Sequence, residues 1–194
     1  MPPITQALLL INVGVFCVQF LLGRFFEGLF ALWPWGNGFL PWQLVTYAFL
    51  HGSPLHLFFN MLGLWMFGSE LERVWGPKRF VQFWIASIVA AAFTQLAVAA
   101  LLGFGAPTVG ASGGLFGLLL AFGMMFPNRI IMPLFPPIPM KAKVFVALFG
   151  GLELLFGFTD TRSGVAHFAH LGGMIGAFLM IQYWRGRPPF GRRR

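Results

Sequence analysis

The sequence predicts an all-α, polytopic membrane protein that forms a single bundle of six transmembrane helices. The first observation is composition: 58% of the 194 residues are hydrophobic and only 9% are charged, whereas a soluble domain carries about 25% charged residues. The second is that six apolar segments reach or approach the length of about 20 residues that spans a bilayer. The third is chain length, because residues 1–194 suit one compact membrane domain and not two.

The six expected helices follow one another along the chain, with boundaries good to a few residues. They cover residues 4–22, 50–67, 80–102, 112–126, 142–158 and 165–184. The fourth is short, so we expect its N-terminus to begin below the membrane surface and to place Ser112 inside the protein. No cleavable signal peptide is evident, so the first apolar segment should stay as a membrane helix.

Two of the connections between the expected helices have a distinctive composition. Residues 24–42 are too long for a tight turn and rich in tryptophan, so we expect them to lie partly in the outer membrane interface. Residues 132–140 contain four prolines and predict a stiff, non-helical cytoplasmic loop. Cys17 cannot form an intramolecular disulfide, and in its apolar run we expect a small buried hydrophobic residue.

The net charge of +8 would suit a nucleic-acid binder, but the basic residues are dispersed or lie at the far C-terminus. We interpret them as topology signals. On one side of the membrane we expect only two basic residues, Arg24 and Arg162, whose charge is partly offset by Glu27 and Asp160, and on the other side all the rest. The positive-inside rule then places both termini and the basic tail 185–194 in the cytoplasm. The remaining basic residues gather in the other loops and the tail: Arg73, Lys78, Arg79, Arg129, Lys141, Lys143, Arg185, Arg187, Arg192, Arg193 and Arg194.

A serine stands among glycines in the apolar chain, in the string Gly110-Ala111-Ser112-Gly113-Gly114. An unpaired polar group in hydrocarbon costs several kcal/mol, so Ser112 is a candidate for function. Helix packing is the alternative, because Gly113-x-x-x-Gly117 is a pattern that lets helices approach closely. The string also satisfies the G-x-S-x-G nucleophile elbow of soluble hydrolases, but no strand precedes it and we reject that fold.

His170 lies in the sixth helix and can serve as the base for Ser112. Imidazole is the usual general base near neutral pH. Gly172-x-x-x-Gly176 gives this helix a close-approach face of its own, so the serine and histidine helices can pack within hydrogen-bond distance. His167, one turn earlier, is a rival base, but nearer the outer boundary an interfacial hydrogen bond suits it better.

His56 and Asn60 are spaced i, i+4 on the second helix and share a face. Both side chains can donate a hydrogen bond to a developing oxyanion, as can the Ser112 backbone N–H at a helix N-terminus. With His51 they should line a polar funnel that opens to the outer side. The alternative for this pair is a polar clamp between helices.

With these motifs the chain resembles the rhomboid intramembrane serine proteases. The resemblance covers nearly the whole chain and includes the minimal arrangement of six helices. The matching strings are His56-x-x-x-Asn60, Gly110-Ala111-Ser112-Gly113, Ala169-His170-x-x-Gly173 and Gly68-x-x-x-Glu72. Each motif alone is weak, whereas all of them in this order in a six-helix chain are specific.

The resemblance implies that Ser112 is the nucleophile and His170 the general base of a dyad without a third acid. It implies an oxyanion hole of His56 and Asn60. The family cleaves transmembrane segments of membrane proteins near their outer end, so the implied partners are transmembrane protein substrates and membrane lipid. It implies no cofactor. The residues themselves lead us to expect no metal and no nucleic acid.

Around the implied dyad, Gly110, Gly113 and Phe116 are expected to pack the active site. Phe116 stands where the family often has tyrosine, so its ring can pack on the imidazole without offering a hydroxyl. Glu153, in the fifth helix, is an unassigned carboxylate that could hydrogen-bond across helices or line the water cavity. Neither Glu153 nor Asp160 is predicted to complete a triad.

Two other functions compete with the protease. One is a catalytically silent rhomboid-like protein that binds transmembrane helices, which would be expected to lack the serine or the histidine. The other is a metal carrier that uses the four histidines, but no Cys or Asp joins them at ligand spacing and the Gly-Ala-Ser-Gly string stays unexplained. The compact chain leads us to expect a bacterial cytoplasmic (inner) membrane.

Overall fold

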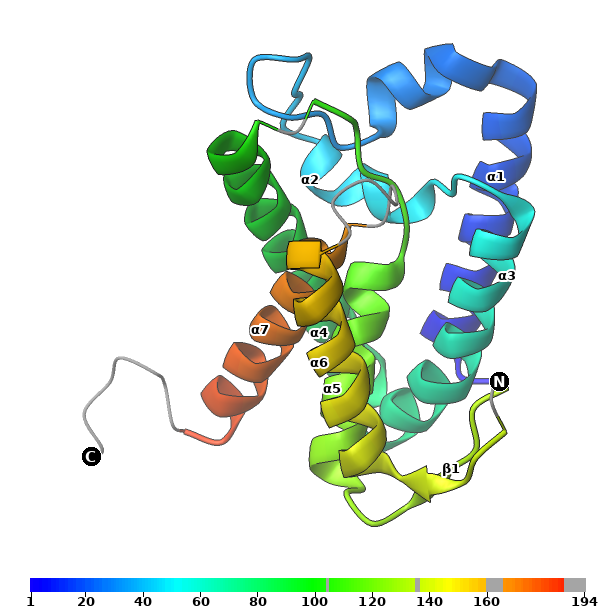
Figure 1. The fold of residues 1–194 in the computed structure, drawn as a ribbon. Coiled ribbons are helices and arrows are strands. Elements are labelled where there is room, and N and C mark those ends of the chain that lie inside the picture. Colours follow the sequence, from blue (N-terminus) through cyan, green and yellow to red (C-terminus); the bar gives the residue numbers. More distant parts are fainter. Residues whose placement is uncertain (104, 135–136, 160–165, 187–194) are drawn as a thin grey trace.

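The computed structural model of the chain describes residues 1–103, 105–134, 137–159 and 166–186. In these residues, helices supply six passes through the bundle, and the expected all-α membrane architecture is confirmed (Figure 1). The helices are α1 (Pro3–Phe30), α2 (Gln43–Thr46), α3 (Pro54–Gly63), α4 (Ser69–Leu102), α5 (Ser112–Met125), α6 (Ala142–Thr159) and α7 (His167–Trp184). A 3₁₀ turn covers Tyr47–Phe49, a π-helical turn covers Leu64–Gly68, and β1 (Ile130–Ile131) pairs antiparallel with β2 (Met140–Lys141).

The second span differs from the expected helix 50–67 at both ends. It begins at Pro54, because Ser53 caps α3 and proline suits the first turn of a helix. The helix then continues through the π-helical turn into α4, and its helical geometry is interrupted only at Gly76, where φ is 76°. Pro77 opens the third span, which ends at Leu102. The stretch Pro54–Leu102 is therefore two membrane passes that join at Gly76.

The first span also extends beyond its expected end. Helical structure continues to Phe30 past a kink at Gly23, so residues 24–30 are helix and not loop. The rest of the connection is organised by Gln43, which is fully buried. Its Oε1 accepts hydrogen bonds from the backbone N–H groups of Trp33 and Leu40, at 3.1 and 3.2 Å. This connection is therefore a folded cap on the bundle.

The start of α1 is anchored by Glu72, the last residue of the Gly68-x-x-x-Glu72 string. This buried carboxylate accepts hydrogen bonds from the backbone N–H groups of Ile4 and Thr5 and from the Thr5 hydroxyl, at 2.9, 2.7 and 2.7 Å. A negative charge at a helix N-terminus satisfies donors that the helix itself leaves unpaired. The string therefore joins the first and second spans.

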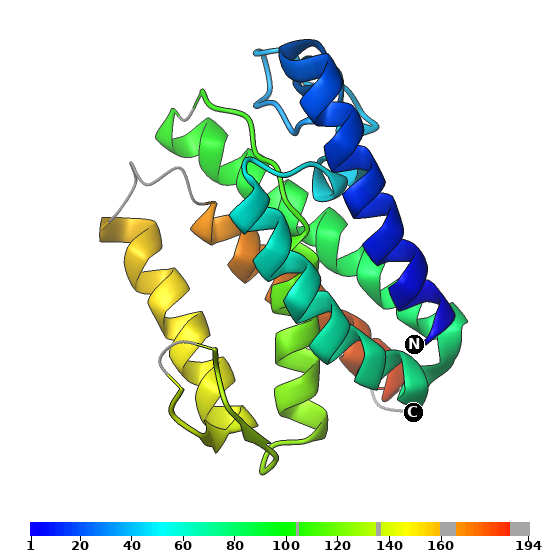
Figure 2. The same cartoon turned by 90° about the vertical axis from the view of Figure 1, so that its right-hand side faces the viewer.

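The centre of the bundle consists of α4, α5 and α7, with α1 and α6 on opposite sides (Figure 2). Glycines bring the central helices together. A Cβ atom on Gly176 would lie 2.5 Å from Ala90 Cβ, and one on Gly117 would lie 2.5 Å from Ser87 Oγ. The small-residue faces predicted for α5 and α7 are thus used, and both helices pack against α4.

The polarity of the bundle suits a hydrocarbon surround. Large apolar side chains such as Phe20 and Leu101 are exposed, each by 83%, while polar residues such as Asn12 and Ser87 are fully buried. Helices α1 and α6, and the stretch Pro54–Leu102, are long and apolar enough to cross a membrane. The chain is an integral membrane protein. Cys17 lies exposed on α1, so the expectation that it is buried was wrong.

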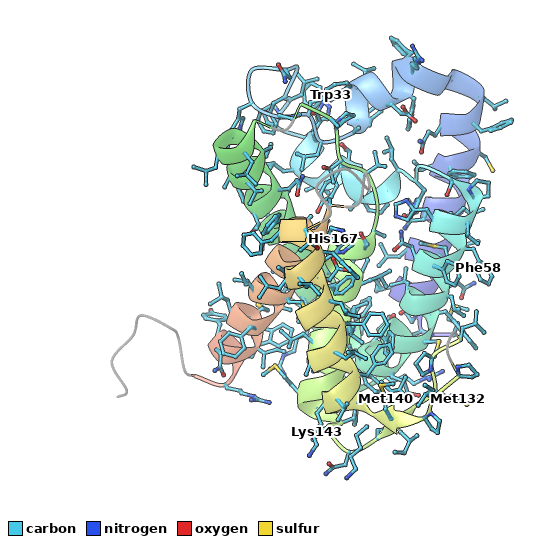
Figure 3. All side chains as sticks on the ribbon, viewed as in Figure 1. Trp33, Phe58, Met132, Met140, Lys143 and His167 are labelled. Atoms are coloured by element: carbon cyan, nitrogen blue, oxygen red, sulfur yellow. The ribbon has the colours of Figure 1, made fainter. Side chains whose placement is uncertain are left out.

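The two ends of the bundle carry different groups. The N-terminus, the β1–β2 hairpin and the end of α7 lie at the lower end of Figures 1 and 2. Trp75 packs edge-on against Trp184 there, with ring centroids 5.3 Å apart, and Arg79 lies over the same ring. In Figure 3, Lys143 lies at this end and Trp33 at the other. The predicted charges at Asp160, Arg162, Arg187 and 192–194 lie outside the described residues.

Candidate active site

Ser112 and His170 meet at the centre of the bundle. Ser112 is the first residue of α5 and His170 lies one turn into α7. The serine Oγ is 2.7 Å from Nε2 of His170, a hydrogen-bond distance. The approach depends on Gly173, because a Cβ atom there would collide with the carbonyl oxygen of Gly113.

Phe116 holds the imidazole from one side. Its ring lies one turn beyond Ser112 on α5 and stacks on the His170 ring, with centroids 4.4 Å apart and planes 8° apart. Such a stack fixes the plane of the imidazole without any contribution from a hydroxyl.

His56 projects from the start of α3, and its ring orientation follows from the turn before it. Ser53 Oγ accepts from the His56 backbone N–H at 3.1 Å and so begins the helix. The Gly52 N–H donates to His56 Nδ1 at 3.4 Å. A neutral imidazole that accepts at Nδ1 carries its proton on Nε2. The Nε2 atom lies beside Gly110, where φ is 129° and an added Cβ would approach it to 2.8 Å.

Asn60 is buried one turn further along α3, and its Nδ2 donor has no hydrogen-bond partner among the described residues. A buried donor without a partner is unusual and calls for an explanation. The side chain lines a cavity of about 550 Å³ into which the candidate residues of three helices converge. The cavity is lined by Gly52, Ser53, His56, Phe59, Asn60, Pro107, Thr108, Val109, Ser112, Ala166 and His170.

His51 is not among the residues that line this cavity. It is almost fully buried, and its ring packs edge-on against His56 at a centroid distance of 5.1 Å. The backbone of His51 is held by Gln19 of α1 through two hydrogen bonds of 3.0 Å. The expectation that His51 lines the funnel was therefore wrong, because the chain before α3 turns this side chain behind His56.

Glu153, which the sequence left unassigned, lies on the far side of His170. Its Oε2 atom is 2.6 Å from Nδ1 of His167 and 2.8 Å from Nδ1 of His170. Both histidines are buried, and they project from the first turn of α7 toward α6. Figure 3 places His167 between the two ends of the bundle, beside α6. Of the two histidines, it is His170 that contacts Ser112.

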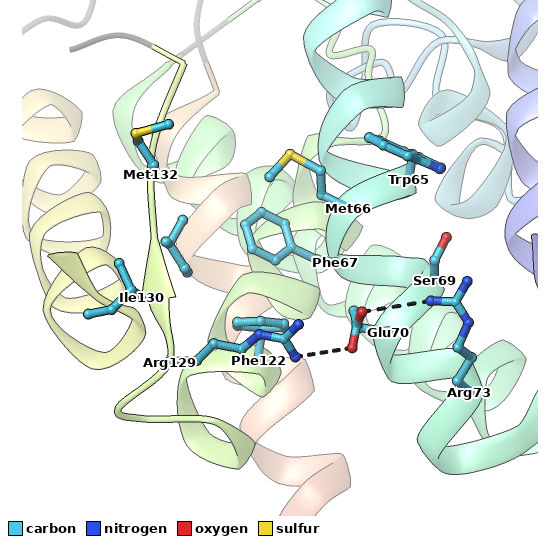
Figure 4. A pocket seen from close by; sticks show the side chains of 11 residues that line it. Trp65, Met66, Phe67, Ser69, Glu70, Arg73, Phe122, Arg129, Ile130 and Met132 are labelled. Carbon is cyan, nitrogen blue, oxygen red and sulfur yellow. Dashed lines mark hydrogen bonds and ion pairs between the residues drawn. The ribbon is translucent and has the colours of Figure 1, made fainter. Parts of the chain in front are cut away.

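A second cavity, of about 380 Å³, lies where the π-helical turn and the start of α4 face β1. Glu70 forms ion pairs there with Arg73 and Arg129, at 3.7 and 3.2 Å (Figure 4). No serine–histidine pair lies among its lining residues, which the structure describes in full. This cavity therefore does not compete with the first as a candidate active site.

A comparison with known protein families gives one match for this chain. The model of the rhomboid domain matches residues 39–187, which is most of the chain and the range in which all four motif strings lie. The chain belongs to the rhomboid family. The match begins before α2 and ends just beyond α7.

Several relatives carry names that describe rhomboid proteins. The chain is 35% identical over 143 residues to Rhomboid protein 1, mitochondrial, of Saccharomyces cerevisiae, which covers 69% of this chain and 39% of the relative. It is 31% identical to rhomboid protease GluP of Bacillus subtilis, over 71% of this chain and 25% of the relative. It is 27% identical to rhomboid protease GlpG of Klebsiella pneumoniae, over 92% and 62%. The chain thus spans less than two thirds of the length of each of these relatives.

Proposed function

We propose that this rhomboid is an intramembrane serine endopeptidase that cleaves transmembrane segments of membrane proteins. The observation that carries the proposal is the 2.7 Å contact between Ser112 and His170 at the wall of a cavity within a membrane bundle, with the polar side chains of His56 and Asn60 in the same lining. The naming of GlpG and GluP as proteases supports the same reaction class.

In the first half of the reaction, Ser112 Oγ attacks the carbonyl carbon of the scissile peptide bond while its proton passes to His170 Nε2. The carbonyl oxygen becomes an oxyanion, and His56 Nε2–H and Asn60 Nδ2–H donate to it. The carbon–nitrogen bond then breaks as His170 gives the proton to the leaving amine. The product is an ester between the substrate and Ser112.

In the second half, water from the cavity gives a proton to His170 and attacks the ester carbonyl. The ester bond breaks, the proton returns to Ser112, and the carboxylic acid product leaves. Water must therefore reach the cavity. Helix α5 has 14 residues and measures about 21 Å, which is shorter than the hydrocarbon core of about 30 Å. Ser112, its first residue, therefore lies below the membrane surface.

We further propose that the cavity opens toward the outer side of a bacterial cytoplasmic membrane. Lys143 lies at the lower end of the bundle in Figure 3, and Arg73 and Arg129 line the second cavity beside β1, which is at the same end. The positive-inside rule assigns this end to the cytoplasm together with both termini. Cleavage would then fall near the outer end of the substrate helix. Neither a cofactor nor a metal is needed for these steps.

The proposal is tested by reconstituting the protein in liposomes with a single-span membrane substrate. We expect wild type to cleave it, and Ser112→Ala and His170→Ala to lose activity by at least about 1000-fold. Ser87→Ala removes another buried hydroxyl, in α4, and is the matched control that keeps activity. A fluorophosphonate probe should label wild type and Ser87→Ala but not Ser112→Ala.

Cleavage that survives Ser112→Ala would overturn the mechanism. A wild-type chain that neither cleaves nor reacts with the probe would instead support a silent helix-binding protein. Labelling without cleavage would mean that the nucleophile is competent and that a different substrate sequence is required.

A further inference from the structure

We propose that Glu153 acts with the Ser112–His170 dyad as a positioning residue, so that this chain uses a Ser-His-Glu arrangement whose carboxylate is shared with His167. The inference rests on the proposed protease function. It concerns the side of His170 that faces away from Ser112, and it assigns a role to a carboxylate in the middle of a membrane helix.

The argument begins with the cost of placing Glu153 where it is. Helix α6 is apolar over most of its length, and the Glu153 side chain is only 13% exposed. A carboxylate in such surroundings needs hydrogen-bond or charge partners. Its partners in the structure are the two imidazoles of α7, both within 2.8 Å of the same oxygen atom.

Proton positions then follow from Ser112. The proposed reaction requires the Ser112 hydroxyl to donate to Nε2 of His170, 2.7 Å away, and the neutral imidazole then has its proton on Nδ1. That Nδ1 atom lies 2.8 Å from Oε2 of Glu153 but is not aligned with it for a hydrogen bond. The aligned bond to the carboxylate is the one from His167, at 2.6 Å. Catalytic hydrogen bonds are often poorly aligned before substrate binds, and a small ring rotation aligns this one.

The carboxylate matters most when His170 becomes positively charged. Once the Ser112 proton reaches Nε2, both nitrogens of His170 carry protons and the imidazolium needs a counter-charge. Glu153 supplies it at contact distance and also favours the neutral form that has its proton on Nδ1. The carboxylate itself stays ionised throughout, so the arrangement moves no proton beyond His170.

The same three residues could be considered as metal ligands, because their ligand atoms lie within 4.8 Å of one another. Tetrahedral zinc with bonds of about 2.0 Å keeps its ligand atoms about 3.3 Å apart. The two contacts of Glu153 Oε2, at 2.6 and 2.8 Å, are both shorter than that. The one with His167 has the length of a charge-assisted hydrogen bond, and the one with His170 is a close contact between a carboxylate and an imidazole. Protons, and not a cation, therefore fit the spaces between these atoms.

Glu153→Gln tests the role, since it keeps the shape of the side chain and removes the charge. We expect kcat for the liposome substrate to fall about 100- to 1000-fold, with KM changed less than about threefold, because a general base that loses its orienting carboxylate is held in the wrong tautomer. The matched control is Glu70→Gln, which removes a carboxylate at the other end of the bundle and should keep kcat.

The pH profile separates this role from a purely structural one. Among the residues that the structure describes, the titratable groups that face His170 are Glu153 from α6, His167 from its own helix and His56 across the cavity. Since a carboxylate favours the protonated imidazole, its loss should move the acid limb of kcat/KM to lower pH even though the plateau falls. The fluorophosphonate labelling rate of Ser112 should show the same shift.

His167→Ala provides the second variant. It breaks the hydrogen bond between α6 and α7 but leaves the carboxylate beside His170, so we expect kcat within about tenfold of wild type and an unchanged acid limb. If His167→Ala instead reproduces the loss and the shift seen in Glu153→Gln, Glu153 is only a clamp and the inference is overturned. It is equally overturned if Glu153→Gln keeps the kcat and acid limb of wild type. If the wild-type chain shows neither cleavage nor labelling, the result contradicts the protease proposal itself and not only the role of Glu153.

Discussion

At the scale of single residues, the candidate site is defined by which nitrogen of each imidazole carries the proton. His56 accepts at Nδ1 from the turn that begins α3, and this leaves Nε2–H to donate into the cavity. In the proposed mechanism His170 accepts at Nε2 from Ser112, 2.7 Å away, and this leaves Nδ1–H to face Glu153. The two histidines thus have opposite tautomers, which suits one to bind an oxyanion and the other to accept a proton.

The assignment of the oxyanion hole predicts a specific kinetic effect. Replacing His56 or Asn60 by alanine removes a donor that acts only on the developing oxyanion, so kcat should fall about 100-fold while KM changes little. Asn37→Ala, in the exposed turn beyond α1, is the control and should retain wild-type rates. Initial rates in liposomes over a range of substrate concentrations separate kcat from KM. An unchanged kcat in both variants would leave the pair as the polar clamp between helices.

At the scale of helices, the distance between Ser112 and His170 is set by glycines on α5 and α7. Gly173→Ala places a methyl group against the Gly113 carbonyl, so the two helices must separate. We expect at least about a 100-fold loss of cleavage, because misplacement of reacting groups by about 1 Å has that effect. Activity assays and fluorophosphonate labelling both measure it.

Gly151→Ala in α6 is the matched control, since nothing lies within 4 Å of an added Cβ there. It should keep wild-type activity and stability. Wild-type cleavage by Gly173→Ala would mean that the packing of α5 on α7 does not determine the geometry of the dyad.

The helices also show which features of the fold could be predicted from the sequence. Segment composition predicted the passes through the membrane, and the glycines of α5 and α7 predicted that both helices pack closely. The face was partly wrong, because Gly172 and Gly176 pack against α4, and it is Gly173 that meets α5 at Gly113. The contact of Glu153 with His170 could not be predicted in the same way. A helix that is apolar on nearly all sides has no periodicity to show which face meets its neighbour, so only packing reveals that Glu153 turns toward α7. Two histidines in the first turn of the next helix were the available signal.

The predicted ends of the first and second spans were wrong for a related reason. The segment after residue 67 stays compatible with helix until Gly76 and Pro77, and residues 24–30 are helical because nothing beyond Gly23 prevents it. Apolar length marks what spans the bilayer, but helices extend past the hydrocarbon wherever the chain permits. The orientation of His51 depended on the turn before Pro54, which composition does not encode.

At the scale of the whole molecule, the charge distribution predicts orientation. Apart from Arg24, the basic residues of the described chain belong to the start of α4, the β1–β2 hairpin, the start of α6 and the end of α7. In Figure 1 these elements lie toward the end that holds the N-terminus, whereas α5 begins, at Ser112, away from that end. In a Cys17→Ser background, Asn37→Cys and Lys143→Cys each place one thiol at an opposite end. An impermeant maleimide on intact bacterial cells should label Asn37→Cys at once and Lys143→Cys only after permeabilisation. The reverse pattern would place the cavity on the cytoplasmic side, and cleavage would then be expected near the inner end of the substrate helix.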